Sequence, residues 1–273
     1  MSEAVAVLHG TFGRACLYAM DRSMVPHAHR EGHLLFHVQG APSEVYVDGC
    51  AIPLAPGRAV AVNPWQAHYY SQPVLGGQTL VLVLYIRPSW FWKASGSRAF
   101  ALRFGRAAIE VSDSRLIDVS SMLDRGQEDP SINDCLLSLT EYCLEQSWHR
   151  NEAAGRFASV QDFRLRKAIQ VLETRVCAPV ELDSVAREAG LSRPHFYKLF
   201  RQQVGVTPNI YLNSLRMERA IERLTGTNEA VAAIGLDLGF SSQASFSRFF
   251  IANGVVPPSA YRRSAQIAYP SEP

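Results

Sequence analysis

Histidines are the residues of this 273-residue chain whose spacing first indicates chemistry. Four of the eight histidines fall between positions 27 and 37, and His68 follows later. If the first segment is a strand, His27 and His29 share one face, because side chains alternate along a strand. Buried imidazoles need a partner, which can be a metal ion, water or an effector. We therefore predict a cavity in the N-terminal part of the chain onto which His27, His29 and His68 point.

The arrangement of these histidines resembles the two signature segments of cupin barrels. His27-x-His29 is followed by Pro56-Gly57 and then by His68, and His33 stands near the position of the usual cupin glutamate. The resemblance implies a divalent metal site, for which zinc, nickel or iron would suit, at His27, His29, His33 and His68. Many barrels of this kind have lost the metal. The alternative is that the same histidines, with Trp65, line an effector pocket or pack in the core.

The sequence around the histidines predicts an all-β unit over residues 1–110. Short apolar or alternating runs, separated by Gly, Pro and Asp turns, lie at residues 34–38, 44–47, 58–62 and 79–86. Regular spacing of this kind is typical of a double-sheet barrel. Together with the C-terminal pattern described below, this gives a mixed fold class: an N-terminal all-β, cupin-like barrel with trailing helices, followed by an all-α domain with two helix-turn-helix motifs.

A helical segment is expected over residues 111–150, with helices near Ser114–Asp124 and Ile132–Trp148. The second helix carries an apolar stripe, which a small barrel would leave partly uncovered: Ile132, Leu136, Leu139 and Cys143. An exposed stripe is costly unless it meets its equal across a two-fold axis. We therefore predict a homodimer made through this stripe, and a linker over residues 151–160.

A pattern in the C-terminal part occurs twice. The first copy runs from Gly190-Leu191-Ser192 to Phe200, and the second from Gly239-Phe240-Ser241 to Phe250. The offset between the copies is 49 at the glycines and 50 at the last phenylalanines, so the second copy has one extra residue after its serine. In each copy an apolar helix ends at a glycine suited to a left-handed C-cap, and Ser192 or Ser241 can cap the next helix. Two helices joined by so tight a turn indicate a helix-turn-helix, whose second helix enters the major groove of DNA.

Helical periodicity separates two faces on each second helix. The apolar positions should face the core: Phe196, Leu199, Phe200, Phe246, Phe249 and Phe250. The outward side chains and those at the helix starts are the candidate DNA-binding residues: Ser192, Arg193, Pro194, Tyr197, Lys198 and Arg201, then Ser242, Gln243, Ala244, Ser247 and Arg248. Arginine and lysine bind guanine edges or phosphates, and glutamine binds adenine. For a single motif a plain solvated face would explain such residues equally well, but two tandem copies favour DNA.

Residues 161–265 resemble the DNA-binding domain of the AraC/XylS family of bacterial transcription regulators. The resemblance rests on the string from Gly239 to Phe250 and on a connecting helix from Tyr211 to Ala220. It implies recognition of promoter DNA in two successive major grooves, about 34 Å apart, with a small-molecule effector, RNA polymerase as a further partner, and no catalytic residues. The family usually has alanine where Gly235 stands, and its later glycine appears one position early, at Gly254. Either departure could loosen the second unit, because glycine costs a helix about 1 kcal/mol relative to alanine.

Charge is distributed unevenly along the chain. Residues 156–265 carry fifteen Lys and Arg against nine Asp and Glu, whereas residues 1–155 carry twelve against fifteen. With Glu272 the net charge is +2, which conceals a basic half. Binding to phosphates needs such a face. No apolar run is long enough to span a membrane, and five cysteines without a spaced pair fit reduced thiols, so we expect a cytoplasmic protein.

Two other interpretations of the chain stay open at this point. The barrel could be a metal-dependent enzyme tethered to DNA, which turnover of a small substrate with bound iron would favour. The chain could instead be a constitutive DNA-binding protein whose barrel is purely structural, which a DNA affinity indifferent to metabolites would favour. The sequence does not name the effector, the operator or the direction of regulation.

Overall fold

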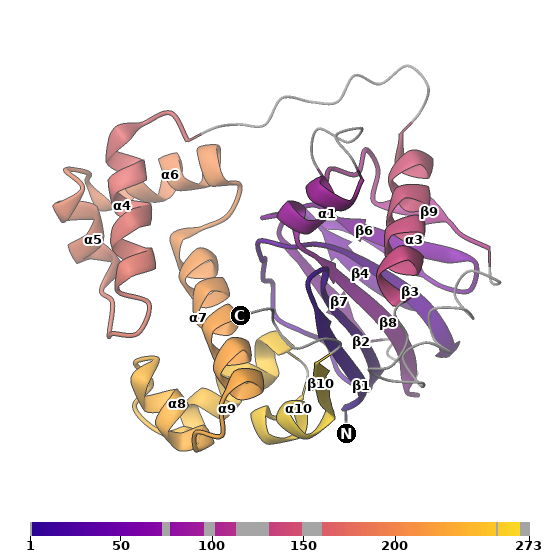
Figure 1. Ribbon diagram of the computed structural model, residues 1–273. Helices are drawn as coiled ribbons and strands as arrows, with labels where there is room; N and C mark the ends of the chain where they lie inside the picture. The colour runs from indigo at the N-terminus through magenta and orange to yellow at the C-terminus, as the bar shows by residue number, and fades with distance from the viewer. Residues whose placement is uncertain are drawn as a thin grey trace.

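A computed structural model describes residues 2–72, 77–95, 102–112, 131–148, 160–254 and 256–267. The described chain forms an N-terminal β-domain followed by a helical domain (Figure 1). This order confirms the mixed fold class. The expected helix at Ser114–Asp124 and nearly all of the expected linker lie outside the described residues. Among the described helices, none is long and apolar enough to cross a membrane.

Two sheets make up the β-domain. The larger sheet has the strand order β10 (Ala265–Ile267), β1 (Glu3–Gly10), β2 (Gly13–Met20), β8 (Thr79–Ile86), β3 (Gly32–Gly40), β6 (Arg58–Val62) and β9 (Ala108–Glu110). The smaller sheet has the order β5 (Cys50–Leu54), β4 (Ser43–Val47) and β7 (His68–Ser71). Each of the four predicted strand runs lies in one of these strands. The run in β8 is almost continuously apolar because β8 has β2 and β3 as neighbours and is buried on both faces.

One face of the larger sheet is covered by helix α3 (Ile132–Ser147), as Figure 1 shows. The four side chains of the predicted dimer stripe point into this contact and are at most 2% exposed: Ile132, Leu136, Leu139 and Cys143. The prediction that the stripe forms a dimer interface is therefore wrong. The larger sheet covers the apolar face of α3, so the stripe belongs to the hydrophobic core of this chain. Helix α1 (Pro88–Ala94), in the segment expected to be all-β, adds Phe91 to the same cluster.

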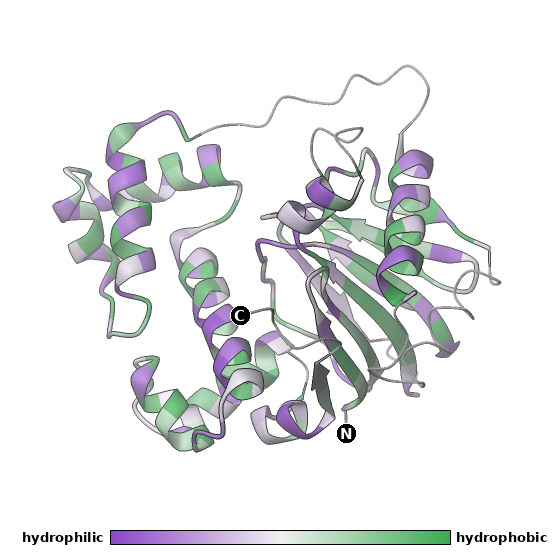
Figure 2. Ribbon diagram, viewed as in Figure 1, coloured by the Kyte–Doolittle hydropathy of each residue, from purple (hydrophilic) through white to green (hydrophobic). Residues whose placement is uncertain are grey.

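Seven helices build the described part of the helical domain. They are α4 (Phe163–Thr174), α5 (Leu182–Glu188), α6 (Arg193–Val204), α7 (Pro208–Gly226), α8 (Val231–Asp237), α9 (Gln243–Gly254) and α10 (Pro258–Ser264). The long helix α7 joins a first unit, made of α4 to α6, to a second unit, made of α8 and α9 (Figure 1). Hydrophobic and hydrophilic residues alternate around these helices, whereas the strands of the larger sheet are mainly hydrophobic (Figure 2). The difference arises because each helix buries only one of its faces, whereas the larger sheet buries both of its faces.

The end of the helical domain returns to the β-domain, which the sequence did not predict. Strand β10 pairs in parallel with β1, with Val7 opposite Ala265. Next to this pairing, the hydroxyl of Tyr261 in α10 lies 3.1 Å from Nε2 of His9 in β1. The two domains are therefore joined by backbone pairing as well as by side-chain contacts.

Stability should depend on pH through His9 at this junction. Burial, followed by the charge of Arg14, lowers the pKa of His9 from 6.5 to about 4. Between these pH values the unfolded chain binds a proton that the folded protein does not, so the stability present above pH 6.5 is lost as the pH falls towards 4. We expect His9 alone to lower the free energy of unfolding by about 2 kcal/mol between pH 7.5 and pH 5.

Urea unfolding at the two pH values measures this loss. The variant His9→Gln should lose less stability on acidification than the wild type, whereas His195→Gln, at an exposed position of α6, should behave like the wild type. An equal pH dependence for wild type and His9→Gln would contradict the assignment.

Candidate nucleic-acid interface and histidine cluster

Each helix-turn-helix turn is closed by a glycine in the left-handed region. Gly190 has φ of 73° and Gly239 has φ of 82°. The turns repeat one hydrogen-bond pattern, in which Leu191 N donates to the Ala186 carbonyl at 2.9 Å and Phe240 N to the Gly235 carbonyl at 3.1 Å. These bonds satisfy carbonyls that a helix end leaves free. The predicted C-caps of α5 and α8 are therefore confirmed.

The two glycines differ in their surroundings, which gives a matched prediction. A Cβ at Gly190 would meet nothing within 4 Å, whereas one at Gly239 would lie 3.0 Å from backbone atoms of Ala178. Gly190→Ala should cost about 1 kcal/mol through its backbone conformation alone. Gly239→Ala should cost more, about 1–3 kcal/mol, because the turn must also move away from Ala178. Chemical denaturation of both variants measures the difference, and equal losses would show that the contact with Ala178 is unimportant.

The second unit is capped by Ser242 and not by the predicted Ser241. Ser242 Oγ accepts from the backbone N–H of Ser245 at 3.2 Å, and Ser245 Oγ lies 3.1 Å from the backbone N of Ser242. This reciprocal pair is the arrangement of a capping box. Ser242 follows Ser192 by 50 residues, so the extra residue of the second copy lies before its cap. Ser192 occupies the N-cap of α6, although its side chain makes no capping hydrogen bond.

The buried faces of α6 and α9 agree with the predicted periodicity. Phe196, Phe200, Phe246 and Phe250 are fully buried, Leu199 is 8% exposed, and Phe249 is half-buried against Phe240. A Cβ at Gly235 would lie 2.8 Å from Cβ of Phe246. The glycine therefore lets α8 and α9 approach closely.

The predicted DNA-binding side chains lie on the opposite faces of α6 and α9. Nine are exposed: Ser192, Arg193, Pro194, Lys198, Arg201, Ser242, Gln243, Ala244 and Arg248. Tyr197 and Ser247 are half-buried. Arg193 is held by an ion pair with Asp183 at 3.0 Å, and the Tyr197 hydroxyl accepts from Asn209 at 3.3 Å. The two faces thus present cations, an amide and hydroxyls, the groups that bind bases and phosphates.

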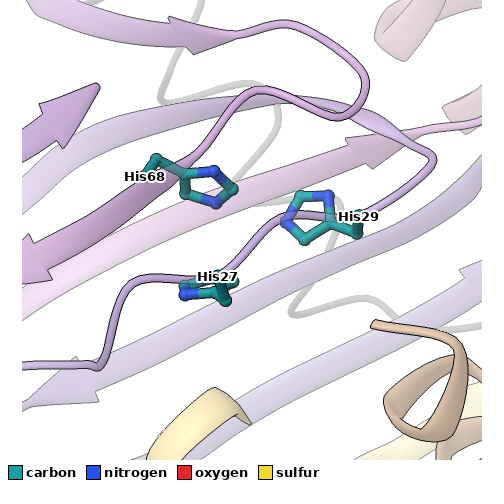
Figure 3. A group of neighbouring side chains, drawn as sticks. All are labelled: His27, His29 and His68. Carbon is teal, nitrogen blue, oxygen red and sulfur yellow. The ribbon is translucent and has the colours of Figure 1, made fainter. Parts of the chain in front are cut away.

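A second group of polar side chains lies inside the β-domain. His27 and His29 come from the segment before β3, and His68 begins β7; Figure 3 shows the three rings gathered around one space. One ligand nitrogen from each ring lies within 4.8 Å of the others. His33 is adjacent, with its ring centroid 4.4 Å from that of His68. The structure thus brings together all four predicted histidines.

Burial favours the neutral form of these imidazoles. Loss of solvent lowers the pKa of His27, and lowers the pKa values of His29, His33 and His68 well below the usual 6.5. In His27, His29 and His68, Nδ1 lies within 3.1 Å of a backbone carbonyl oxygen, of Val25, Glu31 and Gln66 respectively. A carbonyl only accepts, so a neutral ring must carry its proton on Nδ1. Each Nε2 is then left with a free electron pair.

Several nitrogens of the histidine cluster have no hydrogen-bond partner. Nε2 of His29, Nε2 of His68 and both ring nitrogens of His33 are buried without one. Unpaired buried polar atoms are rare and require an explanation. Three neutral imidazoles with their proton-bearing nitrogens fixed by carbonyls have the donor chemistry that a divalent transition metal prefers. The residues present therefore fit the metal implied by the sequence.

Trp65 lies at the edge of this region and faces the helical domain. Its ring stacks on Tyr211 of α7 with a centroid distance of 4.5 Å, and its backbone N–H donates to the His29 carbonyl at 2.8 Å. The two aromatic rings line an open groove of about 570 Å³ at the seam between the domains. Trp65 thus borders the outer groove, whereas the histidines lie within.

Two residues near the cluster were not predicted from the sequence. Arg14 is 9% exposed, and its guanidinium carbon lies 3.8 Å from the ring centroid of Tyr85. Ser214, in the middle of α7, donates from Oγ to the backbone carbonyl of Ala28. The sequence could have indicated Ser214, because it is a polar residue between Leu212 and Leu215 on the buried face of a helix.

Known proteins with similar sequences or folds include several regulators. Residues 185–264 match the family model of a helix-turn-helix domain. The chain is 27% identical over 181 residues to the regulatory protein PocR of Salmonella typhimurium, covering 56% of this chain and 60% of PocR. It is 23% identical over 233 residues to the probable transcriptional regulator LumQ of Photobacterium leiognathi, covering 85% of this chain and 89% of LumQ. A crystal structure of ToxT from Vibrio cholerae matches with a TM-score of 0.57 at 12% identity, over 92% of this chain and 96% of ToxT.

These matches and the two tandem units define a DNA-binding helix-turn-helix domain carried behind a β-domain. This domain is similar to the DNA-binding domains of AraC/XylS-type regulators, and the relatives that the chain matches are named as regulators. The likeness to ToxT concerns the fold. The chain spans about half the length of several of the curated relatives that it matches.

Proposed function

We propose that the protein is a sequence-specific transcription regulator whose β-domain responds to a small effector. The observation that carries the proposal is the pair of exposed polar faces on α6 and α9, held at opposite ends of α7. At 1.5 Å per residue, the 19 residues of α7 extend for about 28 Å. This length is close to the repeat of about 34 Å between successive major grooves on one side of B-DNA.

The basic half of the chain supports binding along a duplex. Lys198, Arg201 and Arg248 project from the exposed faces of the two helices. Cations in such positions release counterions from DNA, so the affinity should fall steeply with salt. The relatives PocR and LumQ carry names of regulators, and none of these observations assigns a reaction to the β-domain.

The β-domain is the part of the chain that would sense the effector. A structure of ToxT is described with an unsaturated fatty acid bound, and its fold matches this chain with a TM-score of 0.53 at 12% identity. Here the histidine cluster and the groove beside Trp65 are the places where an effector would act. The proposal also includes a cupin-like β-domain, a cytoplasmic location and contact with RNA polymerase. It further includes a homodimer, formed through surfaces other than the α3 stripe.

The test is selection of DNA by the full-length protein from a random-sequence library. We expect enrichment of one motif with two half-sites about one helical turn apart. Anisotropy titration should then show an affinity for this motif at least a thousandfold above that for scrambled DNA. Failure to enrich any motif, with the protein folded, would overturn the proposed function.

A further inference from the structure

We propose that the effector of this regulator is a divalent transition-metal ion, bound by His27, His29 and His68 with His33 beside them, and that the ion acts on DNA binding through the contact between Ala28 and Ser214. The first part concerns a binding site and stands alone. The second part rests on the proposed function.

The orientation of the rings supports an ion over a purely structural role. Carbonyls fix the proton-bearing nitrogens of three separate rings, which leaves one lone-pair nitrogen on each ring, and one ligand nitrogen of each ring lies within 4.8 Å of the others. Lone pairs cannot hydrogen-bond to one another, and the single N–H of a neutral His33 can serve only one of them, so the cluster suits a guest that accepts electron pairs or donates protons. The arrangement of imidazole, ion and backbone carbonyl recurs in metal sites, where the carbonyl orients the ring.

The space beside the cluster also favours an ion. A cavity of about 30 Å³ is lined by His27, His29, Tyr85 and Ser214 and by the side chain of Arg14, whereas His33 and His68 do not line it. This volume is enough for water or an ion, whereas pockets for organic ligands usually measure about 300–1,000 Å³. The wider spaces at the domain seam, such as the groove beside Trp65, are open to solvent and do not reach the unpaired nitrogens of the cluster.

The segment that carries two of the ligands is also the segment that docks the helical domain. Ala28, between His27 and His29, is 2% exposed and packs in the core of the first helix-turn-helix unit with Leu212 and Leu215. Its carbonyl accepts a hydrogen bond from the hydroxyl of Ser214 in α7, which also lies 2.8 Å from the Ile210 carbonyl of the same helix. An ion that fixes His27 and His29 therefore fixes the backbone on which α7 rests.

Neighbouring contacts extend this connection. Arg30 forms ion pairs with Glu173 of α4 at 2.6 Å and with Glu218 of α7 at 3.5 Å. The backbones of His27 and His68 are joined by a pair of hydrogen bonds at 3.0 and 2.9 Å. Metal loading thus ties β7, the segment 27–30 and α7 into one unit, and the position of α7 sets the relative position of the two DNA-binding units.

Metal binding is tested first, without DNA. Full-length protein purified without a histidine tag is stripped with a chelator and titrated with Zn²⁺ and, separately, with Co²⁺. We expect one ion per chain, a Co²⁺ absorption spectrum typical of four-coordinate nitrogen ligation, and a rise in thermal stability with Zn²⁺ concentration. Absence of a stoichiometric ion of either metal in the folded wild type would overturn the proposal.

Variants then locate the ion. His29→Gln and His68→Gln should each lower the Zn²⁺ affinity at least tenfold, whereas His37→Gln, at a buried histidine of β3 outside the cluster, should leave it unchanged. Equal affinity in all three variants would place the ion elsewhere and overturn the assignment. If a cluster variant fails to fold, the Co²⁺ spectrum of the wild type decides, because a spectrum of six oxygen ligands excludes the histidine site.

The regulatory part is measured on the DNA motif that the protein selects. Zn²⁺ should change the DNA affinity of the wild type at least fivefold, and the same DNA should change the Zn²⁺ affinity by the same factor, because coupling is reciprocal. In Ser214→Ala the ion should still bind, but the change in DNA affinity should fall below twofold. Thr225→Ala is the control, since its hydroxyl bonds only within α7.

The outcomes separate the two proposals. Stoichiometric Zn²⁺ binding without any selected DNA motif would leave the metal site standing and overturn the proposed function. A selected motif whose affinity is indifferent to Zn²⁺ would support DNA binding and overturn the ion as effector. An unchanged response in Ser214→Ala would overturn the route through Ala28.

Discussion

Replacement of Lys198 and Arg248 by alanine should weaken binding to the selected motif far more than removal of two charges elsewhere. Lys198 lies on the exposed face of α6 and Arg248 on that of α9, so the pair samples both recognition helices. Each side chain is expected to contribute about 1–3 kcal/mol if it binds a base edge. The double variant should therefore bind more weakly by about 2–6 kcal/mol, because the two sites lie in separate units and should act additively.

Anisotropy titration of the single and double variants measures these effects, and salt dependence shows their origin. If Lys198 binds a phosphate, Lys198→Ala should reduce the slope of log affinity against log salt by about 1 and leave sequence preference unchanged. If Arg248 binds a base edge, Arg248→Ala should relax preference at one position of the motif. Arg22→Ala combined with Arg58→Ala removes two exposed charges of the β-domain; this matched control should bind like the wild type. Wild-type affinity in the double variant would show that α6 and α9 are not the recognition helices.

The helix-turn-helix units were predictable from sequence because their determinants are local. The glycine turns and the buried phenylalanines lie within about fifteen residues of one another, and helical periodicity separates their faces. Even so, the N-cap of α9 was predicted one residue too early. Both Ser241 and Ser242 have the right side chain, and only the backbone of the turn shows that Ser242 accepts from Ser245.

Contacts between distant segments were not predictable. The pairing of β10 with β1 joins residues near opposite ends of the chain, and no periodicity in either segment indicates it. The histidine cluster was predictable only in part. The spacing of His27 and His29 predicted a shared site with His68, but the carbonyls that fix their protons and the contact of Ala28 with Ser214 depend on the fold.

The stripe on α3 shows why an apolar helix face does not by itself identify a partner. Periodicity gives the same pattern whether the stripe meets a second copy or a sheet of its own chain. Leu139 is 2% exposed and belongs to the cluster beneath the larger sheet, together with Leu84 and Phe104. The surface that covers the stripe is the larger sheet, and the pairing of its strands was not predicted from the sequence.

Leu139→Glu should consequently unfold the β-domain. Truncation of a buried leucine costs about 2–5 kcal/mol, and burial of a carboxyl group adds a further penalty, so we expect the free energy of unfolding to fall by at least about 4 kcal/mol. Ser138→Glu introduces the same side chain at the adjacent, exposed position of α3 and should change stability by less than about 0.5 kcal/mol. Urea unfolding measures stability, and sedimentation measures assembly, for both variants. A Leu139→Glu protein that keeps wild-type stability but changes from dimer to monomer would show that the stripe meets a second chain and not the sheet.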